Sequence, residues 1–194
     1  MAERPLLVYL HGFNSSPASH KAQVLGRYMA ERGLAERYAC PQLPPLAREA
    51  MAVIDDLLVR HGDESVCYVG SSLGGFYATH LVEARGGKAV LINPAIEPHV
   101  GLRAYLGPQR NFHSGAEYEL TPEHLADWEN LERARITPER YLLVVETGDE
   151  VLDYRQAVQR YAGAQQVLVE GGDHSLQSFP RHLPRILDFA GFGA

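Results

Sequence analysis

The chain has 194 residues, and hydrophobic residue types make up 45% of them. This length supports one substantial core but is short for two independent enzymatic domains, so we expect a single domain. The 24 acidic and 18 basic residues give a formal net charge of −6, and no run of Lys or Arg could neutralise phosphates. The composition therefore argues against a nucleic-acid partner.

The two cysteines, Cys40 and Cys67, lie in apolar, strand-like stretches. The opening MAERPLLVYLHG lacks the basic region and the long apolar run of a signal peptide. The longest apolar stretches have about half a dozen residues, against the roughly 18 needed to span a bilayer. We therefore expect a cytoplasmic protein in a reducing environment, with no membrane span. The oligomeric state is left open.

Short apolar runs rich in β-branched residues alternate with segments of helical periodicity. This alternation is typical of an α/β protein, in which helices cover both faces of a parallel sheet. Helices are expected over residues 18–32 and 47–59, from Ser72 to about Arg85, and after the last strand. The expected strands cover residues 5–10, 37–40, 65–70, 88–92, 141–147 and 165–170.

The segment from Pro94 to Thr137 interrupts this alternation because it contains no convincing strand. Loops of that length are uncommon unless they hold helices or a function, so we expect a helical cap at about 94–137. Thr121-Pro122-Glu123 resembles a helix start, and Leu125, Trp128 and Leu131 would then share one face. Such a stripe is typical of core packing. A wall of a substrate cleft, with Trp128 as a contact residue, is the alternative.

The strongest chemical signal is Gly70-Ser71-Ser72-Leu73-Gly74, which fits G-x-S-x-G with Ser72 at its centre. It lies between a predicted strand and a predicted helix, where a sharp turn exposes the serine hydroxyl. The Leu73 amide, at the helix N-terminus, is placed to stabilise an oxyanion. An incidental serine in a glycine turn or a phosphate-binding loop would give the same pattern, so other residues must support a nucleophile.

A nucleophilic serine needs a base, and His174 in the loop GGDHS follows the last predicted strand. Asp149 follows the preceding strand, 174 − 149 = 25 residues earlier, and is the predicted acid that orients the imidazole. Glu150 and Asp153 are competitors, although Asp153 also stands where a helix N-cap is expected. The order Ser, Asp, His at successive strand ends is that of the α/β-hydrolase fold.

The loop LHGFNSS after the first strand is expected to supply the second oxyanion donor. Gly12 lets the backbone turn so that the Phe13 N–H points at the substrate carbonyl oxygen, with Asn14 as the fallback donor. His11 is expected to shape this loop beside the substrate rather than to act as the base. The other interpretation is an ordinary loop in which Asn14 and Ser15 cap the next helix.

Nearly the whole chain resembles the YqiA/YcfP-type small esterases of the α/β-hydrolase superfamily. The stretches that carry the resemblance are LLVYLHGFNSSPASHKA, VGSSLGGFYATHLVE, KAVLINPA, ETGDEVLDYRQAV and GGDHSLQSF. The resemblance implies a cytoplasmic esterase or thioesterase without a cofactor, acting on simple acyl esters or acyl-CoA through Ser72, Asp149 and His174. The acid loop departs from the superfamily pattern, because Asp153 stands where proline is common.

Several alternatives stay open at this point. The same residues would serve an amidase, a lipase or a carbon–carbon bond hydrolase, because the pocket walls set the substrate. A non-hydrolytic ligand-binding member of the fold is the alternative from a different class. No metal is expected, since the histidines form no H-x-x-x-H pair and the cysteines no C-x-x-C.

Overall fold

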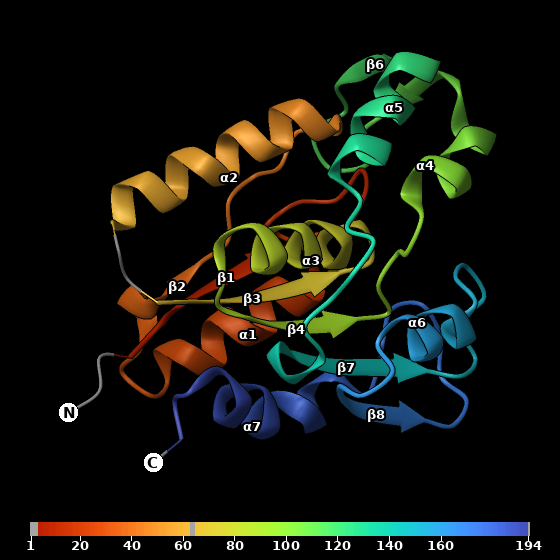
Figure 1. The fold of residues 1–194 in the computed structure, drawn as a ribbon. Helices are drawn as coiled ribbons and strands as arrows, with labels where there is room; N and C mark the ends of the chain where they lie inside the picture. The colour runs from red at the N-terminus through yellow and green to blue at the C-terminus, as the bar shows by residue number, and fades with distance from the viewer. Residues whose placement is uncertain (1–3, 63–64, 194) are drawn as a thin grey trace.

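The computed structural model describes residues 4–62 and 65–193. Six parallel strands form a sheet with the order β2-β1-β3-β4-β7-β8 (Figure 1). All six predicted strands are confirmed to within one residue at either end. They are β1 (Leu6–Leu10), β2 (Tyr38–Ala39), β3 (Val66–Ser71), β4 (Lys88–Ile92), β7 (Tyr141–Glu146) and β8 (Gln165–Val169).

The central strands are buried on both faces, which explains their continuous apolar sequences. In β1, Leu6, Val8 and Leu10 belong to one core cluster, whereas Leu7 and Tyr9 belong to the other. Each cluster lies between the sheet and its own layer of helices. Helices α1 (His20–Ala30) and α7 (Phe179–Ala190) cover one face; α2 (Ala47–His61), α3 (Leu73–Arg85) and α6 (Tyr154–Arg160) cover the other. Short 3₁₀ turns, η1 (Ala35–Arg37) and η3 (Pro138–Arg140), lead into β2 and β7.

The insertion between β4 and β7 is only partly helical, so the expectation that it holds no strand is wrong. Two short strands pair antiparallel within it, with Gly107 opposite Leu120 and Arg110 opposite Glu117. Their sequences, GPQR and EYEL, are largely polar and half-exposed, and therefore lack the hydrophobic pattern of a core strand. The insertion comprises α4 (Pro98–Gly101), η2 (Leu102–Tyr105), β5 (Gly107–Arg110), β6 (Glu117–Leu120) and α5 (Pro122–Leu131).

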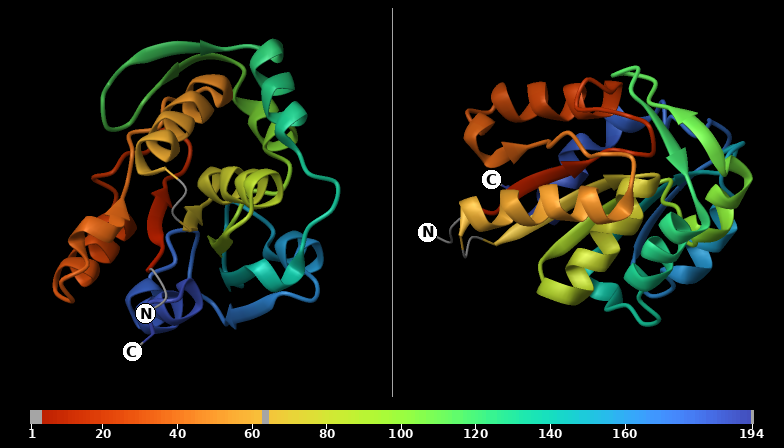
Figure 2. Two further views of the ribbon diagram at one scale, coloured as in Figure 1. Left: turned by 60° about the vertical axis from the view of Figure 1, so that its left-hand side comes forward. Right: turned by 90° about the horizontal axis from the view of Figure 1, so that it is seen from above.

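Helix α5 begins after Thr121 with Pro122 at its first position, as predicted. Leu125 and Trp128 are buried, so the apolar stripe of this helix packs into the core. An ion pair of 2.8 Å between Arg48 of α2 and Asp127 also ties the helix to the body of the protein. Figure 2 shows the β5–β6 hairpin and α5 together along one side of the molecule.

Within residues 4–62 and 65–193, no helix is both long and apolar enough to cross a membrane.

Candidate active site

Ser72 occupies the sharp turn between β3 and α3. Its φ of 54° and ψ of −121° lie in a region that residues with a Cβ rarely adopt. The turn is held by hydrogen bonds, because the Ser72 N–H donates to the Ile92 carbonyl (3.0 Å) and the Ser72 carbonyl accepts from Gly75 and Ala95 (2.9 and 3.0 Å). Ser71 by contrast is buried and only 6% exposed. The turn therefore presents Ser72, rather than Ser71, at the carboxyl edge of the sheet.

Glycines allow the end of β1 and the loop that follows it to pack closely against the Ser72 turn and the start of α3. A Cβ at Gly74 would overlap the Leu10 carbonyl oxygen at the end of β1. A Cβ at Gly12 would lie 3.2 Å from the Ser72 Cβ and 3.7 Å from its hydroxyl oxygen. The loop after β1 thus runs directly beside the Ser72 side chain, as the predicted oxyanion loop must.

The structure brings His174 and Asp149 together. The His174 Nδ1 lies 2.8 Å from the Asp149 Oδ2, and the aspartate side chain is almost completely buried. A carboxylate can only accept here, so Nδ1 carries the proton and Nε2 of the neutral ring keeps its lone pair. Among the described residues, the Ser72 hydroxyl makes no hydrogen bond, and such contacts are often long before substrate binds.

The Asp149 carboxylate is held in its ionised form. Burial acts to raise its pKa, but hydrogen bonds from His174 and from the amides of Leu152 and Val151 outweigh burial, and the pKa lies below its ordinary value. These two amides donate to Oδ1 at 2.9 and 2.8 Å, which leaves Oδ2 for the imidazole. The carboxylate is therefore charged and fixed in orientation.

The two competing acids have other contacts. Asp153 is the N-cap of α6, accepting from the Arg155 N–H (3.0 Å) and pairing with its guanidinium. Glu150 accepts from the His174 backbone N–H at 3.0 Å, so it holds the loop rather than the ring. Of the three candidates, only Asp149 contacts the imidazole.

The two backbone amides predicted to bind an oxyanion have no protein partner among the described residues. Within the part of the chain that the structure describes, neither the Phe13 nor the Leu73 N–H donates a hydrogen bond to another protein group. Leu73 opens α3, and Phe13 follows the Gly12 contact with Ser72. Unpartnered amides close in sequence to Ser72 and to the Gly12 contact are the kind of donor that can stabilise a developing negative charge.

Three residues predicted near the substrate have mainly structural contacts. His11 is buried; its Nδ1 lies 3.0 Å from the Gly12 carbonyl oxygen, and its Nε2 accepts from Leu43 at 3.0 Å. Asn14 accepts from the Tyr118 hydroxyl of β6 at 2.8 Å. Trp128 is fully buried, and its Nε1–H donates to the Tyr77 hydroxyl at 2.9 Å. The polar ring atoms of His11 and Trp128 lie in protein contacts and both side chains are buried, so substrate contact by either residue stays a prediction.

Sequence reasoning missed Asn93, which joins the ends of three strands. Its side-chain amide donates to the carbonyl oxygens of Asp173 and His174, both at 3.1 Å, and its Oδ1 accepts from the Glu146 N–H at 3.0 Å. The residue is buried and has a φ of 40°. The only signal in the sequence was a polar residue between an apolar strand and Pro94.

Glu146, the last residue of β7, was missed as well. Its buried carboxylate accepts from the Asp173 N–H (2.8 Å) and from both the N–H and the hydroxyl of Ser178 (3.1 and 2.6 Å). Burial acts to raise its pKa, but these hydrogen bonds outweigh burial and the pKa is lowered. Asn93 and Glu146 together fix the loop that carries His174.

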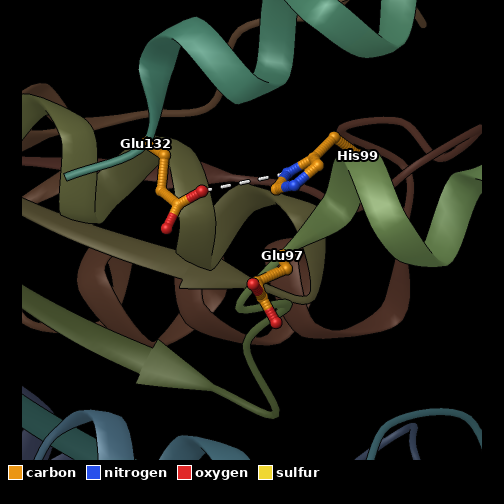
Figure 3. Close-up of side chains that lie close together, drawn as sticks. All are labelled: Glu97, His99 and Glu132. Atoms are coloured by element: carbon orange, nitrogen blue, oxygen red, sulfur yellow. Dashed lines mark ion pairs between the residues drawn. The ribbon is translucent and has the colours of Figure 1, made fainter. Parts of the chain in front are cut away.

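Among the residues that the structure describes, one group of side chains outside this site could hold a metal ion. The donor atoms of Glu97, His99 and Glu132 all lie within 4.8 Å of one another (Figure 3). In the insertion, Glu97 directly precedes α4, His99 lies in α4, and Glu132 directly follows α5. Neighbouring residues of the insertion, among them Leu106 and Leu125, line a cavity of about 230 Å³.

The parallel sheet, with a strained serine after β3 and an Asp–His pair after β7 and β8, is the α/β-hydrolase fold. Alpha/beta hydrolase domain-containing protein 10 from mouse superposes with a TM-score of 0.74 and 16% identity, covering 97% of this chain and 90% of that one. A structure of ferulic acid bound to Est1E from Butyrivibrio proteoclasticus gives 0.68 and 13%, covering 96% and 88%.

Residues 6–191 match UPF0227, described as an uncharacterised protein family, and the chain belongs to that family. The UPF0227 protein YcfP of Salmonella paratyphi B is 20% identical over 190 residues, which are 97% of this chain and 100% of the relative. The resemblance to YcfP-type proteins is thereby confirmed over the full length.

Proposed function

We propose that this protein is a serine hydrolase that cleaves carboxylic esters or thioesters through an acyl-enzyme. The observation that carries the proposal is the buried Asp149 paired with His174, on the same edge of the sheet as the strained Ser72. Neighbours in fold that are named as hydrolases or lipolytic enzymes favour the same reaction class.

In the first step, the Ser72 hydroxyl oxygen attacks the acyl carbon while His174 Nε2 takes the hydroxyl proton. The Phe13 and Leu73 amides stabilise the oxyanion. The carbon–oxygen or carbon–sulfur bond then breaks, and the leaving alcohol or thiol takes the proton from His174. In the second step His174 deprotonates water, which attacks the acyl-enzyme; the Ser72 oxygen–acyl bond breaks, Ser72 takes the proton back from His174, and the acid is released. Asp149 holds the imidazole in the required tautomer throughout.

The test of this proposal is covalent labelling with a fluorophosphonate, which reacts with activated serines. We expect one adduct per chain, located on Ser72 by peptide mass spectrometry. Ser72→Ala should abolish labelling, whereas Ser71→Ala, at a neighbouring buried hydroxyl, should keep it. Hydrolysis of p-nitrophenyl butyrate should follow the same pattern. Labelling that survives in Ser72→Ala would overturn the assignment of Ser72 as the nucleophile. A wild-type protein that binds the probe without forming an adduct would favour a non-hydrolytic binding protein.

Asn93 offers a second test, because its side chain fixes the His174 loop. In Asn93→Gly, the new glycine tolerates the φ of 40° at this position, but the three hydrogen bonds of the Asn93 side chain are lost. We expect kcat to fall about 10- to 100-fold, because small misplacements of a catalytic group have effects of that size. KM should change little. A loss confined to thermal stability, with kcat intact, would show that Asn93 supports the fold alone.

A further inference from the structure

The cluster of Glu97, His99 and Glu132 combines residues that lie 35 positions apart (132 − 97) at the two ends of the insertion. Glu97 precedes the first turn of α4, His99 lies within it, and Glu132 directly follows α5. Figure 3 shows the Glu132 carboxylate directed toward the imidazole, with Glu97 beside them. Imidazole nitrogen and carboxylate oxygen are both ligands that zinc takes in proteins.

The His99 ring supplies a separate observation. Its Nδ1 atom is shielded from solvent and has no hydrogen-bond partner among the described residues. The Glu132 Oε2 lies 4.0 Å from it, which is too long for a hydrogen bond. Buried ring nitrogens normally have a hydrogen-bond partner or a ligand. The unpartnered Nδ1 of His99 therefore indicates an additional group between the imidazole and the carboxylate.

We propose that Glu97, His99 and Glu132 bind one divalent transition-metal ion of the zinc class. His99 would coordinate through Nδ1 and each glutamate through one carboxylate oxygen, with water completing a four-coordinate shell. Imidazole nitrogen favours zinc over magnesium or calcium, which prefer oxygen ligands alone. A neutral imidazole and two carboxylates balance the double positive charge.

The side chains need only a small adjustment to bind such an ion. Tetrahedral ligands at zinc distances lie about 3.3 Å apart, somewhat closer than the present donor atoms. Glu97 is exposed and the Glu132 side chain is 41% exposed, so both can change rotamer without disturbing the core. Arg103 and Glu129, which carry opposite charges, also line the cavity beside His99.

The place of the cluster indicates a structural role for the ion, separate from the proposed hydrolysis. The ion would link the start of α4 to the end of α5 and so connect the first and last parts of the insertion. The first part is attached to the serine turn, because the Ala95 N–H donates to the Ser72 carbonyl just before α4. The ion therefore stabilises the insertion without touching the reacting atoms.

The direct test is isothermal titration of the full-length, metal-free protein with ZnSO₄. We expect one site per chain in the wild type, no binding at that site in His99→Gln, and binding at least 10-fold weaker in Glu132→Gln. Zinc should raise the melting temperature of the wild type and leave that of His99→Gln unchanged. Circular dichroism establishes that the variants are folded.

Two control variants separate this site from other histidines. His61→Gln, at the end of α2, and His174→Gln, in the Asp149 pair, should both keep the wild-type stoichiometry. The proposal is overturned if His99→Gln binds zinc as the wild type does, or if His174→Gln loses the site. Because the titration needs no substrate, its result does not depend on whether Ser72 is a nucleophile.

Discussion

Replacing Asp149 with Asn should lower kcat about 10⁴-fold while the protein stays folded, as expected when a triad aspartate is neutralised. The Asp149 Oδ1 accepts two backbone amides, and the Asn side-chain oxygen can still accept them. The side-chain amide would then face His174 and could only donate, which would force the proton from Nδ1 to Nε2. The ring could then no longer accept the Ser72 proton.

Asp153→Asn is the matched control, since the same change is made four residues further on (153 − 149). Asp153 caps α6, and Asn caps a helix about as well as Asp. We expect a near-normal kcat for this variant on p-nitrophenyl butyrate, with unchanged circular dichroism for both. A large loss in Asp153→Asn beside a near-normal Asp149→Asn would transfer the role of the acid to Asp153.

Gly74→Ala should destabilise the protein by more than about 4 kcal/mol, or prevent it from folding. The added methyl group would overlap the Leu10 carbonyl oxygen of the adjacent strand, and backbone on both sides leaves it no room to move. Relief of the overlap requires α3 to shift away from β1, which would open the centre of the core. Urea unfolding followed by circular dichroism measures the loss.

Gly101→Ala in the insertion is the control for this substitution. It lies in α4, and apart from its chain neighbours and the backbone of its own helix no atom of the described chain lies within 4 Å of the added methyl group. Alanine also favours helix over glycine by up to about 1 kcal/mol, so we expect unchanged or slightly higher stability. Equal stability of the two variants would show that the contact between α3 and β1 is looser than the structure indicates.

The regular framework of the fold could be predicted from the sequence. Stretches such as LLVYL and YLLVV are apolar because both faces of each strand are buried, and that burial is visible in a local window. Thr121 and Pro122 marked the start of α5 by the same kind of local chemistry. The order of serine, acid and histidine followed from the order of the strands.

The identity of the histidine's partner could only be decided by the tertiary structure. Asp149, Glu150 and Asp153 lie within five residues of sequence, and no local pattern says which carboxylate reaches the imidazole. The choice depends on how β7 and β8 are aligned and on the amides of Val151 and Leu152. These distances exist only after the chain has folded.

The remaining differences have the same physical origin. Strands β5 and β6 pair only with each other and are not buried on both faces, so they leave no apolar pattern to read. Asn93 acts through contacts with residues 53 to 81 positions away, and Glu97 meets Glu132 across the whole insertion. Which faces of a strand or helix are buried is recorded in the pattern of apolar residues within that element, and the sequence by itself determined it. Hydrogen bonds and ligand clusters between the ends of different elements depend on long-range packing, which only the tertiary structure decided.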